Sequence, residues 1–129
     1  MGKAIALAYS EHGATVVCAA RTDKEIQTVA EEIISKNGKA LAIPTDVTSL
    51  KSIKKTFKKV KEQFGRIDIL VINAGINSDR NLVEESQPED WVETINVNLI
   101  GAYYCARSVI PYYERIWRKD FDNRFRQRT

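Results

Sequence analysis

The segment from Ile67 to Gly75 limits what this chain can fold into more than any other part of it. It reads Ile-Asp-Ile-Leu-Val-Ile-Asn-Ala-Gly, a β-branched and aliphatic run that stops at a small polar turn. A run that is apolar on both faces predicts a buried strand of a parallel sheet with helices on each side. Ligands bind just past the carboxyl ends of such strands, so Asn73, Ala74 and Gly75 are candidate site residues. A plain strand followed by a turn explains the same residues equally well.

Hydrophobic periodicity divides the rest of the chain into alternating strands and helices. Strands are predicted over residues 14–20, 40–45 and 67–72. Helices are predicted over residues 1–12, 22–36, 50–64 and 88–110. This alternation is typical of a doubly wound parallel α/β sheet.

Polar caps and glycines mark where these helices begin and end. Thr22 with Glu25, and Ser86 with Glu89, are predicted capping boxes, and Thr48 or Ser49 is expected to cap the third helix. Helix ends are predicted at Gly13, Asn37-Gly38 and Gly65.

The fourth helix, residues 88–110, has a broad apolar face that is wide enough to cover a sheet and a second subunit. The residues of this face are Trp91, Val92, Ile95, Leu99, Ala102, Tyr103, Ala106 and Ile110. Asn96 and Asn98 also lie in this helix, although asparagine is a weak helix former. Either one of them has a function or the helix is irregular there.

Composition indicates one globular domain, since 43% of the 129 residues are hydrophobic and 29% are charged. No run approaches the roughly 18 apolar residues of a membrane span, and the N-terminus lacks the layout of a signal peptide. A cytoplasmic location is therefore the default expectation. Cys18 and Cys105 have neither metal-ligand spacing nor a secretory context, so we expect buried thiols and no metal site.

Charge is concentrated at the C-terminal end, where residues 114–129 carry the whole net charge of +3. Such a shift in composition marks a boundary. The predicted third helix also has a lysine-rich face. Nucleic-acid contact is one interpretation of these basic surfaces, but no aromatic residues are interleaved with the lysines, so a solvated helix face is favoured.

Five short features resemble the short-chain dehydrogenase/reductase family in order and spacing. They are Gly2 opening a helix, Arg21 after a strand, Asp46-Val47 after the next, Asn73-Ala74-Gly75 after the third, and Asn96-Val97-Asn98-Leu99 in the following helix. The resemblance covers residues 1–112. It implies a partial Rossmann-like, NADP-binding domain that lacks the family's first strand and C-terminal half.

The resemblance also implies roles for individual residues. Asp46 and Val47 would lie against the adenine, and the turn 73–75 would line the adenosine half of the cofactor. Asn98 would be the catalytic asparagine that holds a water in a proton relay. Gly2 would be the last glycine of the phosphate-binding turn, and Arg21 and Thr22 would also contact the cofactor.

Arg21 implies NADP(H) as the cofactor. NAD-preferring members of the family have an acidic residue where this chain has Ala20, and a guanidinium can hold a 2′-phosphate through a charge-assisted fork. An exposed arginine after a strand is the alternative.

The sequence departs from the family at both ends. Only Gly2 matches the glycine-rich turn that receives the pyrophosphate, and neither the catalytic serine nor a Tyr-x-x-x-Lys pair is present. We therefore expect a fragment of an oxidoreductase that binds NADP(H) weakly or not at all and does not turn over. One alternative is a non-catalytic interaction module that pairs through helix 88–110 with itself or with a full-length relative. A basic-tailed nucleic-acid binder is the weaker alternative.

The tail, residues 113–129, does not match the family. If its codons are read one nucleotide later, starting within the codon for Tyr113, their degeneracy allows a segment that resembles the family's loop, strand and catalytic serine. Trp117 then forces a glycine, because the last two bases of TGG begin a glycine codon. We therefore expect the tail to be a frameshifted translation, which the gene sequence would test; an amphipathic basic helix is the alternative.

Overall fold

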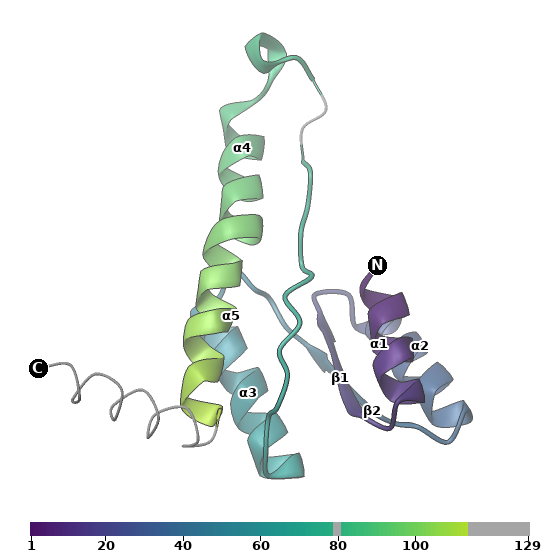
Figure 1. Ribbon diagram of the computed structural model, residues 1–129. Coiled ribbons are helices and arrows are strands. Elements are labelled where there is room, and N and C mark those ends of the chain that lie inside the picture. Colours follow the sequence, from purple (N-terminus) through teal and green to yellow (C-terminus); the bar gives the residue numbers. More distant parts are fainter. Residues whose placement is uncertain (79–80, 114–129) are drawn as a thin grey trace, which may run out of the picture.

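The computed structural model describes residues 1–78 and 81–113 and has an α/β architecture (Figure 1). The N-terminal elements are α1 (Gly2–Glu11), β1 (Thr15–Ala20), α2 (Asp23–Ser35), β2 (Lys39–Pro44) and α3 (Leu50–Phe64). The later elements are the 3₁₀ turn η1 (Val83–Glu85), α4 (Pro88–Ile95), the π-helix η2 (Asn96–Gly101), α5 (Ala102–Val109) and the 3₁₀ turn η3 (Ile110–Tyr112). In Figure 1, α1 and α2 lie to one side of the strands, and α3 and α5 lie to the other. The predicted tail, except Tyr113, lies outside the described residues.

The sheet of the described residues consists of β1 and β2, which pair in parallel from Thr15 with Lys39 to Ala20 with Pro44. The pairing continues one residue further, because the Thr45 amide donates to the Ala20 carbonyl at 2.9 Å. The carboxyl ends of both strands are thereby held together. This confirms two of the three predicted strands and their parallel arrangement.

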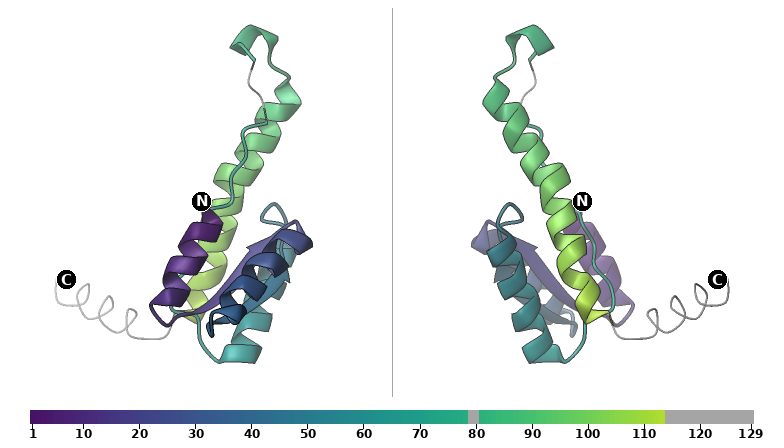
Figure 2. Two further views of the ribbon diagram at one scale, coloured as in Figure 1. Left: turned by 90° about the vertical axis from the view of Figure 1, so that its right-hand side faces the viewer. Right: turned by 90° about the vertical axis from the view of Figure 1, so that its left-hand side faces the viewer.

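The third predicted strand, over residues 67–72, is wrong as an element of secondary structure. The segment takes an irregular, elongated course along the long helix (Figures 1 and 2) and has no place in the sheet. Ile67 and Leu70 pack into the core, but Ile69 is 60% exposed and Ile72 is 44% exposed. A strand needs a hydrogen-bonded neighbour as well as an apolar sequence, and neither β1 nor β2 pairs with this segment.

The core has two parts. The first contains Cys18, Ile26 and Ile33 and is completed by apolar side chains of α1, β1, α2 and β2. The second contains Ile53, Phe57 and Val109, with Cys105 among the side chains packed around them. Burial raises the pKa of both cysteine thiols, and both are free; Cys18 is buried as predicted, whereas Cys105 is only half-buried.

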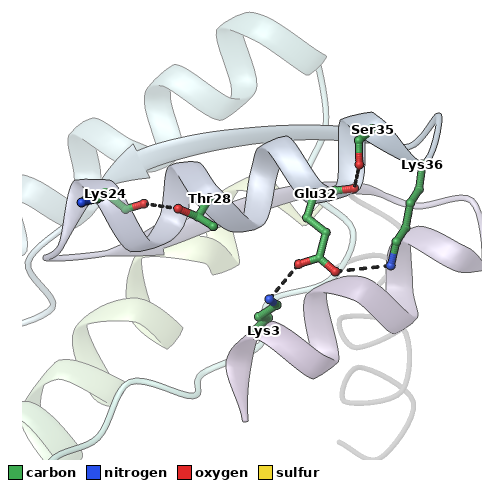
Figure 3. Close-up of polar contacts among 6 residues, drawn as sticks. All are labelled: Lys3, Lys24, Thr28, Glu32, Ser35 and Lys36. Carbon is green, nitrogen blue, oxygen red and sulfur yellow. Dashed lines mark hydrogen bonds and ion pairs between the residues drawn. The ribbon is translucent and has the colours of Figure 1, made fainter.

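Helix α1 is joined to α2 by the carboxylate of Glu32, which lies between two lysines (Figure 3). Its oxygens are 2.7 Å from the Lys3 ammonium and 3.3 Å from that of Lys36. Hydrogen bonds from Lys3 and then Lys36 hold the pKa of Glu32 below its ordinary value. Both lysine side chains are more than half exposed, so this contact orients the helices more than it stabilises them.

The predicted helix stops are confirmed. Gly13, Gly65 and Asn37 have φ angles of 86°, 79° and 62°, in the left-handed region where helices commonly end. Ser49 is the N-cap of α3, and its hydroxyl accepts from the Ser52 amide at 3.2 Å.

Both predicted capping boxes are wrong. Thr22 occupies the N-cap of α2 but makes no capping hydrogen bond with its side chain. Helix α4 begins at Pro88 as predicted, but its N-cap is Gln87 and not Ser86. The Ser86 hydroxyl donates instead to the Val83 carbonyl at 2.7 Å, a local bond that competes with capping.

The predicted helix 88–110 is continuous, but its middle is the π-helix η2, and its apolar face is placed differently from the prediction. Trp91, Ile95, Leu99 and Tyr103 are between 45% and 60% exposed. The buried side of this helix consists of Val97, Gly101, Ser108 and Val109. The predicted apolar residues are exposed both before η2, at Trp91 and Ile95, and after it, at Tyr103. Within the described residues, no helix is both long and apolar enough to cross a bilayer.

Candidate nucleotide-binding edge

The carboxyl ends of β1 and β2 place Arg21 and Asp46 at the same edge of the sheet. The two strands are parallel and in register, so the residues that follow them emerge side by side. The positive charge of Arg21 is close enough to Asp46 to contribute to lowering the pKa of its carboxyl. This edge therefore carries a cation near a carboxylate.

The carboxylate of Asp46 is fixed by its own turn. One of its oxygens, Oδ1, accepts from the Thr48 hydroxyl at 2.7 Å and from the Thr48 amide at 2.9 Å. The hydroxyl bond first, and then the amide bond, hold the pKa of Asp46 below its ordinary value. Asp46 is thus an anion at neutral pH and a ready acceptor for an amine.

Three hydroxyl residues behind this turn were not among the predicted site residues. Thr45 and Thr56 are each 7% exposed, and their hydroxyl oxygens are 2.7 Å apart. The Asp46 amide donates to the Ser52 hydroxyl at 3.1 Å. Thr56 occupies an inward position of α3 between the buried Ile53 and Val60. A polar residue within an apolar face was the signal in the sequence that could have identified it.

Two glycines allow the residues that follow the segment 67–72 to approach other elements closely. A β-carbon on Gly2 would lie 2.9 Å from the Asn73 amide nitrogen, so the first turn of α1 touches Asn73 directly. A β-carbon on Gly75 would lie 3.4 Å from the Asn98 amide oxygen. The turn 73–75 is exposed and therefore accessible to a ligand.

Asn98, in the π-helix η2, uses both polar atoms of its side chain on the backbone of Ile76. Its amide oxygen accepts from the Ile76 N–H, and its amide nitrogen donates to the Ile76 carbonyl, both at 2.8 Å. Both interpretations of an asparagine in this helix therefore hold, because the helix is irregular and the side chain has a definite partner. The role of holding a catalytic water stays a prediction, and the side chain itself fastens the loop after Gly75.

At Gly101, the same helix packs against the turn that contains Asp46 and Val47. A β-carbon on Gly101 would lie 2.9 Å from the Val47 Cγ2 atom and 3.2 Å from its carbonyl oxygen. The helix and the turn after β2 are therefore in close contact at Val47. Among the predicted site residues, three pairs that are distant in sequence are brought together: Gly2 with Asn73, Gly75 with Asn98, and Arg21 with Asp46. Thr22 and Ala74 adjoin such residues only along the chain.

A small hollow of about 80 Å³ lies elsewhere, between the loop and the start of the long helix. Its lining residues are Asn77, Asn81, Val83, Trp91 and Thr94. None of them is a predicted site residue, so the hollow is separate from the edge described above. Within residues 1–78 and 81–113, no three His, Cys, Asp or Glu side chains are grouped as metal ligands would be.

Comparison with known proteins accounts for this arrangement. The family model of the short chain dehydrogenases matches residues 1–119. The chain belongs to this family. The short-chain dehydrogenase fold explains why the edge after β1 and β2, the turn 73–75 and the asparagine of the long helix lie together.

Individual members of the family are similar over most of this chain. A 3-oxoacyl-(acyl-carrier-protein) reductase FabG of Thermotoga maritima is 38% identical over 112 residues, which are 87% of this chain and 45% of that protein. A crystal structure of a 3-ketoacyl-ACP reductase from Sinorhizobium meliloti has a TM-score of 0.82 at 37% identity and covers 86% of this chain and 44% of that one. The chain thus spans less than half the length of these relatives.

A third similar protein has a bound nucleotide. It is a metagenomic short-chain oxidoreductase in complex with NADP, with a TM-score of 0.80 and 32% identity over 86% of this chain and 50% of that one. The family thus includes a structural neighbour of this chain that binds the phosphorylated cofactor.

Proposed function

We propose that this chain is the adenosine-binding portion of an NADP(H)-dependent short-chain dehydrogenase, which in its full-length form reduces a carbonyl or oxidises an alcohol. The observation that carries the proposal is the pair formed by the Arg21 cation and the Asp46 carboxylate at the carboxyl ends of β1 and β2. The NADP complex of a similar oxidoreductase supports the choice of cofactor.

The residues of this edge fit the adenosine half of NADP(H). The Arg21 guanidinium has the charge and donors for a 2′-phosphate, and the Asp46 carboxylate accepts a hydrogen bond from the adenine amine. Val47 and the small residues of the turn 73–75 offer space for a flat ring. The nicotinamide ring of the bound cofactor would supply or accept the hydride.

Other parts of the reaction require groups that residues 1–129 do not include. Hydride transfer to a carbonyl needs an acid that protonates the oxygen, and the sequence has no Tyr-x-x-x-Lys pair. We therefore propose that residues 1–129 do not turn over by themselves. We also expect NADPH to bind them weakly, because the glycine-rich turn that would receive its pyrophosphate is represented by Gly2 alone.

The cofactor assignment predicts that the 2′-phosphate is recognised through Arg21. In NMR titrations, 2′-AMP should bind at least tenfold more tightly than 5′-AMP, and Arg21→Gln should remove this preference, because a charge-assisted fork is lost. These nucleotides carry the adenosine half without a pyrophosphate, so they test this edge by itself.

Lys24→Gln is the matched control, since Lys24 is an exposed cation in the first turn of α2. It should leave the preference for 2′-AMP intact. Equal binding of 2′-AMP by the parent and by Arg21→Gln would exclude Arg21 as the phosphate ligand, and tighter binding of NADH than of NADPH would exclude the NADP assignment.

A second candidate function is supported by the exposed apolar side chains of the long helix. Trp91, Ile95, Leu99 and Tyr103 recur every four residues and are all exposed to solvent by 45% or more. An apolar row of this kind marks a protein-binding surface. The helix would then pair with a second copy of the chain or with a full-length relative, without catalysis.

The pairing function predicts that Leu99→Lys weakens self-association. Light scattering should show dimers or larger species of the parent, and the variant should shift them toward the monomer, because a charge in the middle of an apolar interface is costly to bury. Lys55→Ala on the exposed face of α3 is the control. A parent chain that is monomeric, both alone and mixed with an intact relative, would refute the pairing function.

A further inference from the structure

Two consecutive residues at the end of β2 are bonded to two side chains one turn apart on α3. The hydroxyl of Thr45 meets that of Thr56, with their oxygens 2.7 Å apart, and the backbone amide of Asp46 donates to the Ser52 hydroxyl at 3.1 Å. Ser52 and Thr56 are four positions apart, so they lie above one another on one face of the helix. We call these four residues the β2–α3 latch.

The hydrogen positions in the latch follow from counting donors. Thr45 donates its hydroxyl proton to the Ile43 carbonyl at 2.9 Å. A hydroxyl has one proton, so Thr56 is the donor in the bond between the two threonines. A threonine within a helix commonly donates to the carbonyl four residues before it, and Thr56 instead donates across to β2. In the bond between the two threonines, α3 therefore supplies the donor and the residue after β2 supplies the acceptor.

Packing alone does not require this arrangement. Two buried hydroxyls that bond each other can be replaced by apolar groups of the same shape with almost no change in stability. The latch differs from an apolar contact because its bonds are directional, and they act on Thr45 and Asp46, the residues that lead into the nucleotide-binding edge. It fixes where the backbone of Asp46 points.

We propose that Ser52 and Thr56 are positioning residues that orient Asp46 toward the adenine amine. This inference rests on the proposed function. The carboxylate is held on one side by Thr48, through its oxygen Oδ1, and the latch holds the backbone from which that carboxylate extends. Neither Ser52 nor Thr56 needs to touch the nucleotide.

The test compares Thr56→Val and Ser52→Ala with Thr56→Ser, which keeps the hydroxyl. The carboxyl pKa of Asp46, measured by carbon NMR without nucleotide, should rise toward its ordinary value in the first two variants and stay low in Thr56→Ser. The affinity for 2′-AMP should fall about fivefold in the first two variants and be retained in the third. Thr28→Val is the control, because the Thr28 hydroxyl is exposed and donates to the Lys24 backbone carbonyl within α2.

The two readouts separate the inference from the proposed function. If the pKa of Asp46 is the same in Thr56→Val and Ser52→Ala as in the parent, the latch has only a structural role and the inference is wrong, whether or not 2′-AMP binds. If the pKa responds as expected but the parent does not bind 2′-AMP, the latch is confirmed and the proposed function fails. If Thr56→Val does not fold, Ser52→Ala decides by itself, because Ser52 is only partly buried.

Discussion

Replacing Ile53 with alanine is expected to lower the free energy of unfolding by about 2–5 kcal/mol. Ile53 is 1% exposed and lies in the centre of the second core, where it packs with Phe57 and Val109. The substitution removes buried methyl groups and leaves a cavity that the surrounding helices fill only in part. Urea denaturation followed by circular dichroism measures the change.

Lys54→Ala, next to it on the exposed face of α3, is the matched control and should change the stability by less than about 0.5 kcal/mol. The core has two parts, so amide hydrogen exchange should quicken more in α3 and α5 than in β1 and α2. Equal loss of protection in both parts would show that the two clusters unfold as one unit. A loss of stability below about 1 kcal/mol would contradict the packing seen at Ile53.

Gly101→Val is expected to destabilise the chain by about 1–3 kcal/mol. Gly101 has helical angles, φ −60° and ψ −43°, so helix propensity alone would favour replacing it. The structure predicts the opposite sign, because a β-carbon there would lie 2.9 Å from the Val47 side chain and 3.2 Å from its carbonyl oxygen. That oxygen belongs to the backbone after Asp46 and cannot move without disturbing the turn.

Ala106→Val is the control for Gly101→Val, since it places the same β-branched residue on the exposed side of the same helix. Thermal melting of the two variants should separate the contact with Val47 from the cost of a β-branched residue in a helix. The NMR signals of Val47 and Thr48 should shift in Gly101→Val and stay in place in Ala106→Val. If the stability of Gly101→Val is unchanged or raised, the long helix is not in close contact with the turn at Val47.

Features that depend on neighbouring residues could be predicted from the sequence. Gly65 ends α3 because a glycine adopts a positive φ at little cost, and Ser49 caps the same helix because its hydroxyl reaches the Ser52 amide. The position of Arg21 and Asp46 followed in the same way, since each comes directly after a short apolar strand. These features need no knowledge of what lies across the sheet.

Features that depend on a distant neighbour could not be predicted. The apolar run of residues 67–72 has the composition of a buried strand, yet whether it pairs is decided by what lies beside it. The face of the long helix was misplaced for a related reason, because the elements that lie against the helix, such as the Val47 turn at Gly101, decide which side chains are buried. Thr56 and Gly101 are ordinary helix residues until β2 and Val47 are brought against them.

The π-helix in the long helix has a consequence for insertions and deletions. The helix is fastened at two points, where Asn98 bonds Ile76 and where Gly101 rests on Val47. If the helix otherwise keeps its present twist, deleting one residue between these points would rotate Gly101 away from Val47 by about a quarter of a turn. Only one of the two attachments could then be kept. The number of residues between Asn98 and Gly101 therefore sets the angle between the two contacts around the helix, and family members that share both contacts are expected to keep that number constant.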